Sequence, residues 1–283
     1  MLTRLREGRA DATNEARSEE ATGRSTPGVA VEGAAIRVAA LRRSFGALQA
    51  IEHVDLEAEP GEVLGVVGPS GCGKTTLLEL IAGLQDPDGG SIAVGDRGDP
   101  EGRLSHCAYM PQRDLLLPWL SALDNAALPL RIAGASRLQS RLAASDHFQR
   151  VGLTGFEQTR PDQLSGGMRQ RVAFVRTLLA GKPVLLLDEP FASLDAITRA
   201  EMQSWLGGIL DPDRHTVVLV THDVEEALYL SDRVVVLSAR PATVADRIDS
   251  PAPRAADRAA AVTSPRFAET KQRALRSLAG SGP

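Results

Sequence analysis

The sequence predicts an α/β fold with a mainly parallel core sheet, and two observations support this. Short apolar runs at residues 63–67, 184–187 and 217–220 have the length of buried strands. Each run is bracketed by segments of helical character, and strand–helix alternation of this kind builds parallel sheets with helices on both faces. The first run also leads through a glycine-rich loop straight into a helical segment. Such a strand–loop–helix unit belongs in a parallel sheet.

The chain ahead of the first buried strand divides into two parts. Residues 1–34 are rich in Arg, Glu, Ala, Gly and Ser without apolar periodicity, so we expect a disordered tail there. Apolar and polar residues alternate over 36–38 and 51–56, as in half-buried antiparallel strands. The Pro-Gly pair at 60–61 marks a turn. An N-terminal antiparallel β subdomain is therefore expected before the parallel core.

Helices are predicted between and after the buried strands. Residues 75–82 form a helical run, which Asp-Pro-Asp-Gly-Gly at 86–90 should break. Apolar residues at three- and four-residue spacing predict that 121–159 is largely helical. Residues 234–237 have the character of a further strand, and 265–278 that of an amphipathic helix.

These elements suggest the organisation of the whole chain. With 283 residues, 43% of them apolar, the chain is long enough for one large domain with a sizeable core. We place this domain at residues 35–250, with an inserted α-helical subdomain at about 113–180. Residues 251–283 are expected to be a C-terminal linker and helix.

Composition argues against several classes of function. The net charge of −4 does not favour electrostatic binding of nucleic acid, and the aromatic content of 4% does not favour stacking on its bases. Nucleic acid is therefore not expected as a partner. The two cysteines, Cys72 and Cys107, fit a reducing compartment and offer no disulfide or zinc framework. The apolar runs are too short to cross a bilayer and no secretory signal opens the chain. A membrane role would therefore depend on a partner.

The glycine-rich loop carries the first chemical motif. Residues 68–75 match the P-loop pattern of Gly, four residues, Gly-Lys and Ser or Thr, and an ordinary glycine-rich turn is the alternative. In a P-loop the backbone N–H groups surround the β-phosphate, Lys74 reaches the β- and γ-phosphates, and the Thr75 hydroxyl can ligate Mg²⁺. We expect the following residues at the nucleotide: Gly68, Pro69, Ser70, Gly71, Cys72, Gly73, Lys74, Thr75 and Thr76.

Cys72 leaves two interpretations open. A thiol near a helix N-terminus has a lowered pKa, so an exposed Cys72 would alkylate readily. Alternatively, the sulfur is a small buried filler beneath the loop.

Three polar residues follow two of the buried strands. Asp188 and Glu189 come directly after one strand, and His222 closes another, so all three should stand at the carboxyl edge of the sheet beside the P-loop. Asp188 could hold Mg²⁺, and Glu189 is the candidate for polarising the attacking water. His222 could donate a hydrogen bond to the γ-phosphate. The alternatives are a solvated Asp-Glu pair that caps a turn and a structural histidine.

A second phosphate-binding helix end is indicated at Leu-Ser-Gly-Gly-Met-Arg-Gln-Arg, residues 164–171. Ser165 can cap a helix, although a cap alone would not require Gly166 and Gly167. With this segment the sequence resembles the ABC ATPase family, whose signature is Leu-Ser-Gly-Gly-Gln or a close variant. The resemblance covers about residues 35–240, and its motifs occur in the family order.

The resemblance implies roles for further residues. Phe45 resembles the aromatic that stacks on adenine, and Gln112 the Q-loop glutamine that ligates Mg²⁺ and links the site to the membrane subunit. Asp195 resembles the D-loop aspartate, and His222 the switch histidine. Two departures are Ala-Ser at 192–193, where many members have Ser-Ala, and Met at position 168 instead of the commoner Gln. The catalytic set so implied is Lys74, Glu189 and His222, with Thr75, Gln112 and Asp188 at the metal.

Residues 113–130 point to one importer branch. Together with Met-Arg-Gln-Arg at 168–171, they are similar to ATPases that serve nitrate, sulfonate, taurine or thiamine-precursor uptake. The alternative is that this apolar segment only packs against the helical lobe.

The family resemblance also implies partners. Two ATPase subunits, expected to be identical, would form a head-to-tail dimer in which each ATP meets Lys74, Thr75 and Asp188 of one copy and residues 165–167 of the other. Membrane-spanning permease subunits and, indirectly, an extracytoplasmic solute-binding protein would complete the transporter. The chain would lie in the cytoplasm, on the inner face of the cell membrane. An ABC-type ATPase that remodels DNA or ribosomes, and a regulator that no longer hydrolyses ATP, are the rival functions.

Overall fold

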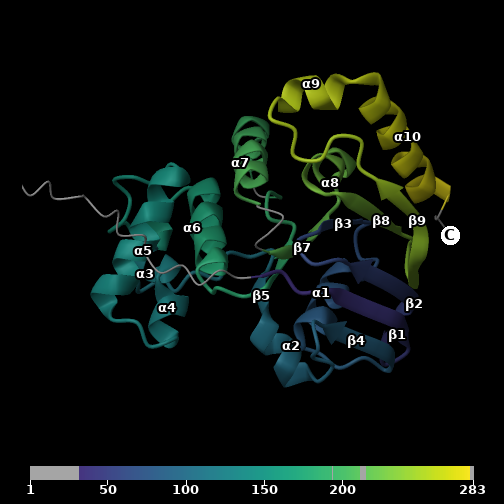
Figure 1. The fold of residues 1–283 in the computed structure, drawn as a ribbon, viewed down its shortest axis with the longest axis horizontal. Coiled ribbons are helices and arrows are strands. Elements are labelled where there is room, and N and C mark those ends of the chain that lie inside the picture. Colours follow the sequence, from purple (N-terminus) through teal and green to yellow (C-terminus); the bar gives the residue numbers. More distant parts are fainter. Residues whose placement is uncertain (1–31, 193, 211–214, 281–283) are drawn as a thin grey trace, which may run out of the picture.

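The computed structural model describes residues 32–192, 194–210 and 215–280 (Figure 1). The tail expected over residues 1–34 therefore falls almost wholly outside the described residues. Five parallel strands form one side of a nine-stranded sheet, with β5 at its edge, which confirms the predicted α/β fold with a mainly parallel core. In sheet order they are β5 (Cys107–Met110), β6 (Val184–Asp188), β7 (Thr216–Thr221), β3 (Val63–Val67) and β8 (Arg233–Leu237).

The parallel strands are mostly apolar because both of their faces are buried. In β7, Val217 and Leu219 belong to one hydrophobic cluster, whereas Val218 and Val220 belong to a second cluster. Successive side chains of a strand point to opposite faces of the sheet, so the two clusters are the cores above and below it. Parallel sheets covered by helices on both faces show this pattern.

Four strands extend the sheet into a largely antiparallel arm, shown in purple and blue at the lower right of Figure 1 together with the green β9. They are β1 (Ile36–Phe45), β2 (Leu48–Ala58), β4 (Gly89–Val94) and β9 (Ala242–Asp249). β1 pairs antiparallel with both β2 and β4, as the alternating pattern of the N-terminal strands predicts. β9 pairs antiparallel with β8 and parallel with β2, so it joins the arm to the core.

The first helix ends at residue 82, as the sequence predicts, but Gly83 ends it instead of residues 86–90. α1 (Lys74–Ala82) stops at Gly83, whose φ of 79° lies in the left-handed region that favours glycine. A Cβ at Gly83 would lie 2.3 Å from the carbonyl oxygen of Pro100, the first residue of α2 (Pro100–His106). Residues 86–90 therefore do not break the helix, and Gly89 and Gly90 instead begin β4.

The middle of the chain forms a helical lobe beside the sheet, shown in teal (Figure 1). It contains α3 (Ala122–Ala126), α4 (Leu128–Ile132), α5 (Arg137–Arg150), a short 3₁₀ helix (Pro161–Gln163) and α6 (Gly166–Leu178). Phe148 of α5 and Phe174 of α6 are both buried in the core on one side of the sheet. The helical lobe therefore shares a hydrophobic core with the sheet.

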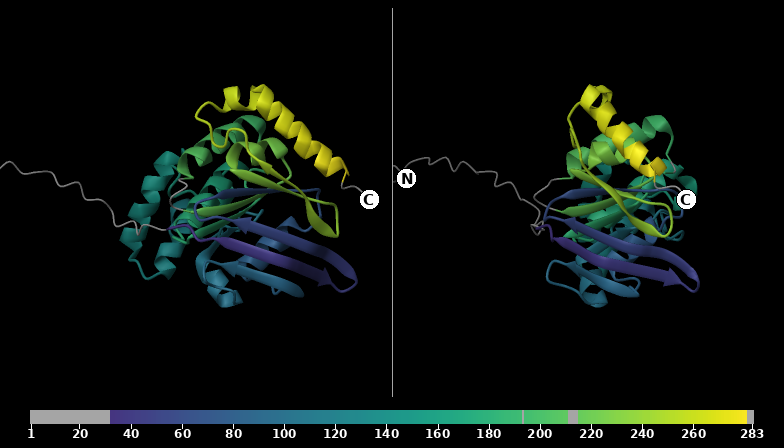
Figure 2. Two further views of the ribbon diagram at one scale, coloured as in Figure 1. Left: turned by 45° about the vertical axis from the view of Figure 1, so that its right-hand side comes forward. Right: turned by 90° about the vertical axis from the view of Figure 1, so that its right-hand side faces the viewer.

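The remaining helices lie across one end of the molecule (Figure 2). They are α7 (Ala196–Ile209), α8 (Val224–Leu230), α9 (Arg258–Thr263) and α10 (Pro265–Gly280). α10 packs against α8 and β9, and it confirms the amphipathic helix predicted over 265–278. Phe267 and Ala274, two turns apart on one face, are its buried residues.

Candidate functional site

A cleft of about 500 Å³ opens at the carboxyl edge of the parallel strands, where such sheets place their ligand sites. Its wall combines the loop before α1, the ends of β1 and β2, and residues that follow β5, β6 and β7. The lining residues are Phe45, Leu48, Ala50, Ser70, Gly71, Gly73, Lys74, Thr75, Thr76, Gln112, Glu189, His222 and Arg240. Segments more than a hundred residues apart in the sequence therefore meet in this cleft.

The loop between β3 and α1 turns on two glycines. Gly71 and Gly73 have φ values of 75° and 112°, a region that side chains seldom tolerate. A Cβ at Gly73 would also lie 3.2 Å from the carbonyl oxygen of Ala50. Lys74 folds back along the loop, and its Nζ donates to the carbonyl oxygens of Gly68 at 2.8 Å and Pro69 at 3.0 Å.

Cys72 points away from the cleft. Its side chain is 1% exposed and belongs to the hydrophobic cluster that also contains Ile51 and Leu78. Burial raises the pKa of the thiol, which outweighs the opposing charge of Lys74. The structure therefore corrects the interpretation of Cys72 as an exposed, activated thiol, because the loop turns its side chain inward. The sulfur is the buried filler of the alternative interpretation.

Asp188 ends β6 next to the loop. Its Oδ2 accepts a hydrogen bond of 2.8 Å from Thr75 Oγ1 and one of 3.3 Å from the Tyr109 hydroxyl. Asp188 is 1% exposed, and burial raises its pKa although the bond from Thr75 lowers it. Burial and the nearby carboxylate of Asp188 also raise the pKa of Tyr109, so its phenol remains a donor. The sequence interpretation did not include Tyr109, whose position three residues before Gln112 is the only signal for it.

Glu189, His222 and Gln112 form a second cluster at the mouth of the cleft. Glu189 Oε2 lies 3.1 Å from His222 Nδ1 and accepts from Gln112 Nε2 at 3.3 Å. The backbone of Glu189 has a φ of 45°, and its N–H donates to Val220 O at 2.8 Å. A non-glycine residue in this region costs on the order of 1–3 kcal/mol, and such strain concentrates at functional sites.

Phe45 stands at the far end of the cleft. Its ring is 44% exposed and lies 4.8 Å from the guanidinium carbon of Arg43, in the geometry of a cation–π contact. Phe45 is one of the residues that line the cleft. An exposed aromatic ring with a polar neighbour is suited to stack on a flat base.

Ser165 and Asp195 are helix caps outside this cleft. Ser165 Oγ accepts from Met168 N at 3.2 Å at the start of α6, with Gly166 and Gly167 in its first turn. Asp195 Oδ1 accepts from the backbone N–H groups of residues 197 and 198, both at 3.1 Å, at the start of α7. In the part of the chain that the structure describes, residues 165–167 and Asp195 do not line the cleft that contains Lys74. Their helix ends remain open to a neighbouring molecule.

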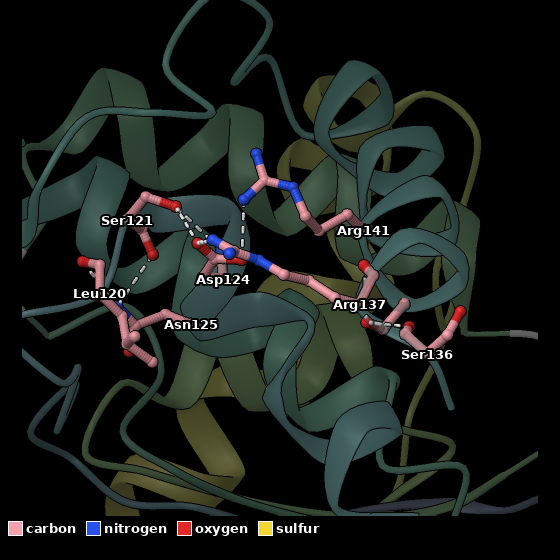
Figure 3. A network of polar contacts seen from close by, with 8 residues as sticks. Leu120, Ser121, Asp124, Asn125, Ser136, Arg137 and Arg141 are labelled. Atoms are coloured by element: carbon pink, nitrogen blue, oxygen red, sulfur yellow. Dashed lines mark hydrogen bonds and ion pairs between the residues drawn. The ribbon is translucent and has the colours of Figure 1, made fainter. Parts of the chain in front are cut away.

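Two neighbouring side chains of α3 hold different parts of the lobe: Asn125 the segment after Gln112, and Asp124 helix α5 (Figure 3). Asn125 is fully buried, accepts from Leu117 N at 2.7 Å, and donates to the carbonyl oxygens of Leu117, Leu120 and Ser121. Asp124 is also buried and binds Arg137 at 3.2 Å and Arg141 at 2.8 Å, which secures α5.

That same segment exposes large apolar side chains. Leu115 and Trp119 are 60% and 68% exposed. The alternative in which the apolar segment only packs against the lobe is therefore wrong for these two residues, while Leu116 is buried. On its inner side, Arg176 of α6 donates to the carbonyl oxygens of Leu115 at 2.8 Å and Asp114 at 2.6 Å.

The chain is similar in sequence to known transport proteins. Residues 51–192 match the family model described as "ABC transporter". The formylaminopyrimidine import ATP-binding protein ThiZ of Halalkalibacterium halodurans is 45% identical over 191 residues, which cover 68% of this chain and 74% of that protein. The nitrate import ATP-binding protein NrtD of Synechococcus elongatus is 43% identical over 233 residues, covering 81% and 85%.

Solved structures agree in fold. The dimeric post-hydrolysis structure of the ATP-binding cassette MJ0796 bound to ADP and Pi has a TM-score of 0.69 and 28% sequence identity to this chain. The match covers 76% of this chain and 98% of that one. The architecture is thus that of an ATP-binding cassette, a P-loop ATPase. The chain belongs to the ABC transporter family.

Within residues 32–192, 194–210 and 215–280, no helix has the length and apolar character required to span a membrane.

Proposed function

We propose that this chain is the ATP-binding and ATP-hydrolysing subunit of an ABC importer, which couples ATP hydrolysis to solute uptake. The observation that carries the proposal is the meeting of the P-loop, Glu189 and His222 at one cleft, with Asp188 bonded to Thr75 of the loop. The oxygens of a phosphate chain in the loop would accept hydrogen bonds from backbone N–H groups and from the Lys74 ammonium. Its terminal phosphate would then point toward Glu189 and His222.

Glu189 is proposed to orient and polarise the attacking water. Because its carboxylate lies 3.1 Å from His222 Nδ1 and 3.3 Å from Gln112 Nε2, its orientation is set from two sides. His222 is 54% exposed and can donate to the terminal phosphate from the opposite ring nitrogen. Lys74 would leave its carbonyl partners and bind phosphate oxygens instead.

The donors at the base of the cleft suit Mg²⁺. The hydroxyl of Thr75 and the carboxylate of Asp188 are hard oxygen donors 2.8 Å apart, and Gln112 lines the same cleft. Among the described residues, no three His, Cys, Asp or Glu side chains gather closely enough to hold a metal alone. This set fits Mg²⁺, which binds one or two protein ligands together with phosphate oxygens and water. When bound, the ion neutralises charge on the β- and γ-phosphate oxygens.

A second ATPase copy would complete the site. Ser165 and its two glycines form a helix N-terminus outside the cleft, and such an end attracts phosphate. We propose that this end faces the ATP held by Lys74 of the other copy. The MJ0796 cassette with ADP and Pi is dimeric, which supports a dimeric arrangement here.

Permease subunits are proposed to dock on a groove between the sheet and the helical lobe. Leu84, Leu115 and Ile132 line it and are 51%, 60% and 78% exposed, an unusual concentration of apolar surface. Through its bonds to the backbone of residues 114 and 115, Arg176 connects this groove to α6, the helix whose N-cap is Ser165. The chain would thereby lie on the inner face of the cell membrane.

The transported solute is proposed to be small and delivered by an extracytoplasmic binding protein. Two relatives are named as nitrate and formylaminopyrimidine import proteins. Both of these solutes are small, which supports a small solute here.

The test is steady-state phosphate release by the purified chain with Mg²⁺ and ATP. We expect release that Glu189→Gln abolishes and that Glu269→Gln, the same change on the surface of α10, leaves intact. Absence of release from the unmodified protein, alone and with its permease, would refute the proposed function.

A further inference from the structure

The two C-terminal helices reach the part of the chain that carries His222. Lys271 of α10 donates to Glu225 Oε2 at 2.8 Å, and Arg258 of α9 donates to Glu225 Oε1 at 3.0 Å. Glu225 lies in the first turn of α8, three residues after His222. Both oxygens of this carboxylate are therefore held by cations from a segment that follows the ATPase motifs in the sequence.

The first turn of α8 connects Glu225 to His222, which lines the cleft. Asp223 caps the helix by accepting from the N–H groups of Glu225 at 2.9 Å and Glu226 at 3.3 Å. His222 directly precedes this cap, and its imidazole lies 3.1 Å from Glu189. Because a capped helical turn is stiff, a displacement of Glu225 moves the backbone of His222 with it.

Arg258 also ties α8 to α7. Its Nε donates to Gln203 Oε1 at 3.1 Å, and Gln203 Nε2 donates to Glu226 Oε2 at 3.1 Å. Gln203 and Glu226 are 1% and 3% exposed, so this connection is shielded from water. The guanidinium carbon of Arg258 further lies 5.4 Å from the ring of Tyr229 in α8. The cation of α9 is thus anchored to both helices that follow the site.

We infer that Lys271 and Arg258 act through Glu225 as positioning residues for His222, so that the C-terminal helices set the geometry of the Glu189–His222 pair. This inference rests on the proposed function. It assigns a part in the reaction to a segment that contributes no residue to the cleft. In general, a substitution far from the reacting atoms that displaces a catalytic group by about 1 Å can lower turnover by up to about 100-fold.

The decisive variant is Lys271→Met, which keeps the length of the side chain and removes its charge. We expect kcat for phosphate release to fall about threefold to tenfold, in line with a loss of positioning and not of the group itself. KM for ATP should stay within about twofold, because the nucleotide contacts of the P-loop are untouched. Lys271→Arg should restore kcat.

Arg273→Met is the matched control. Arg273 lies on the same helix and makes an ion pair of 2.7 Å, but with Asp246 of β9, away from α8. If α10 only stabilises the fold, both methionine variants lower Tm and change kcat alike. Equal effects on kcat would overturn the inference, whereas a loss confined to Lys271→Met and Glu225→Gln supports it.

A second measurement does not depend on ATPase activity. The imidazole resonances of His222, assigned by comparison with His222→Gln, should shift in Lys271→Met and not in Arg273→Met. Unchanged His222 resonances in Lys271→Met would refute the positioning role even if the protein is an active ATPase. Conversely, a shift in a protein that releases no phosphate would contradict the proposed function alone.

Discussion

His222 Nδ1 lies 3.1 Å from Oε2 of Glu189, so the residues that follow the neighbouring strands β7 and β6 meet across the mouth of the cleft. The contact depends on the left-handed backbone of Glu189, whose N–H is held by Val220 O in the adjoining strand. The proposed general base and the histidine beside it are thereby placed by the ends of two neighbouring strands.

Lys74→Ala and Glu189→Gln should separate binding from turnover. In the proposed function the Lys74 ammonium contacts phosphates in the ground state, so its removal should weaken ATP binding at least about tenfold. Glu189→Gln removes only the negative charge that is proposed to act on water, so binding should persist while phosphate release falls at least about 100-fold. Nucleotide titration and a phosphate assay on each variant measure both quantities. Normal turnover in Glu189→Gln would exclude this residue from catalysis.

The proposed split site predicts an ATP-dependent dimer. With hydrolysis blocked by Glu189→Gln, the protein should dimerise with ATP on a sizing column. Adding Ser165→Arg should abolish the dimer, because the new side chain crowds a helix end where only serine and glycine stand. The matched control is Ser204→Arg on the exposed face of α7, which should leave dimerisation unchanged. A doubly substituted protein that dimerises as well as Glu189→Gln would show that Ser165 does not face the nucleotide.

Cys72 should resist alkylation in the folded protein. Its sulfur is buried and its pKa is raised by burial, so labelling by N-ethylmaleimide should be at least about 100-fold slower than in denaturant. Because Cys107 is buried as well, a Cys107→Ser variant isolates the signal. Mass spectrometry over time measures it. Rapid labelling of the native protein that ATP suppresses would instead place the thiol in the cleft.

Glu226 should make folding stability depend on pH. Burial raises its pKa to about 7 from the ordinary value of 4.5, so the folded state retains a proton that the unfolded state has lost. Stability contributed by this group therefore falls as pH rises from about 4.5 to 7 and then levels off. Glu226→Gln keeps an acceptor for Gln203 and cannot ionise.

We expect the free energy of unfolding of Glu226→Gln to exceed that of the unmodified protein above pH 7, by on the order of 3 kcal/mol, and to match it near pH 4. Urea unfolding at several pH values provides the measurement. Parallel pH profiles for the two proteins would show that Glu226 is ionised in the folded state.

Motifs whose chemistry is local could be located from the sequence. The P-loop, Asp188, Glu189 and His222 all follow short apolar runs, and parallel strands bring their carboxyl ends to one edge. The cleft joins the P-loop with Glu189 and His222, and Asp188 contacts Thr75 at its base, as that reasoning expects. β4 and β9 were missed because β4 begins with two glycines and β9 carries several charged residues and is only partly buried.

By itself, the sequence determined the parallel core, the phosphate loop and the amphipathic last helix, because periodicity and glycine placement act over a few residues. Tertiary structure alone decided that the Cys72 sulfur lies in the core, that the Tyr109 hydroxyl reaches Asp188, and that Lys271 meets Glu225. Each of these depends on side-chain directions and on contacts between residues far apart in the chain, which are set only when the sheet and its helices pack.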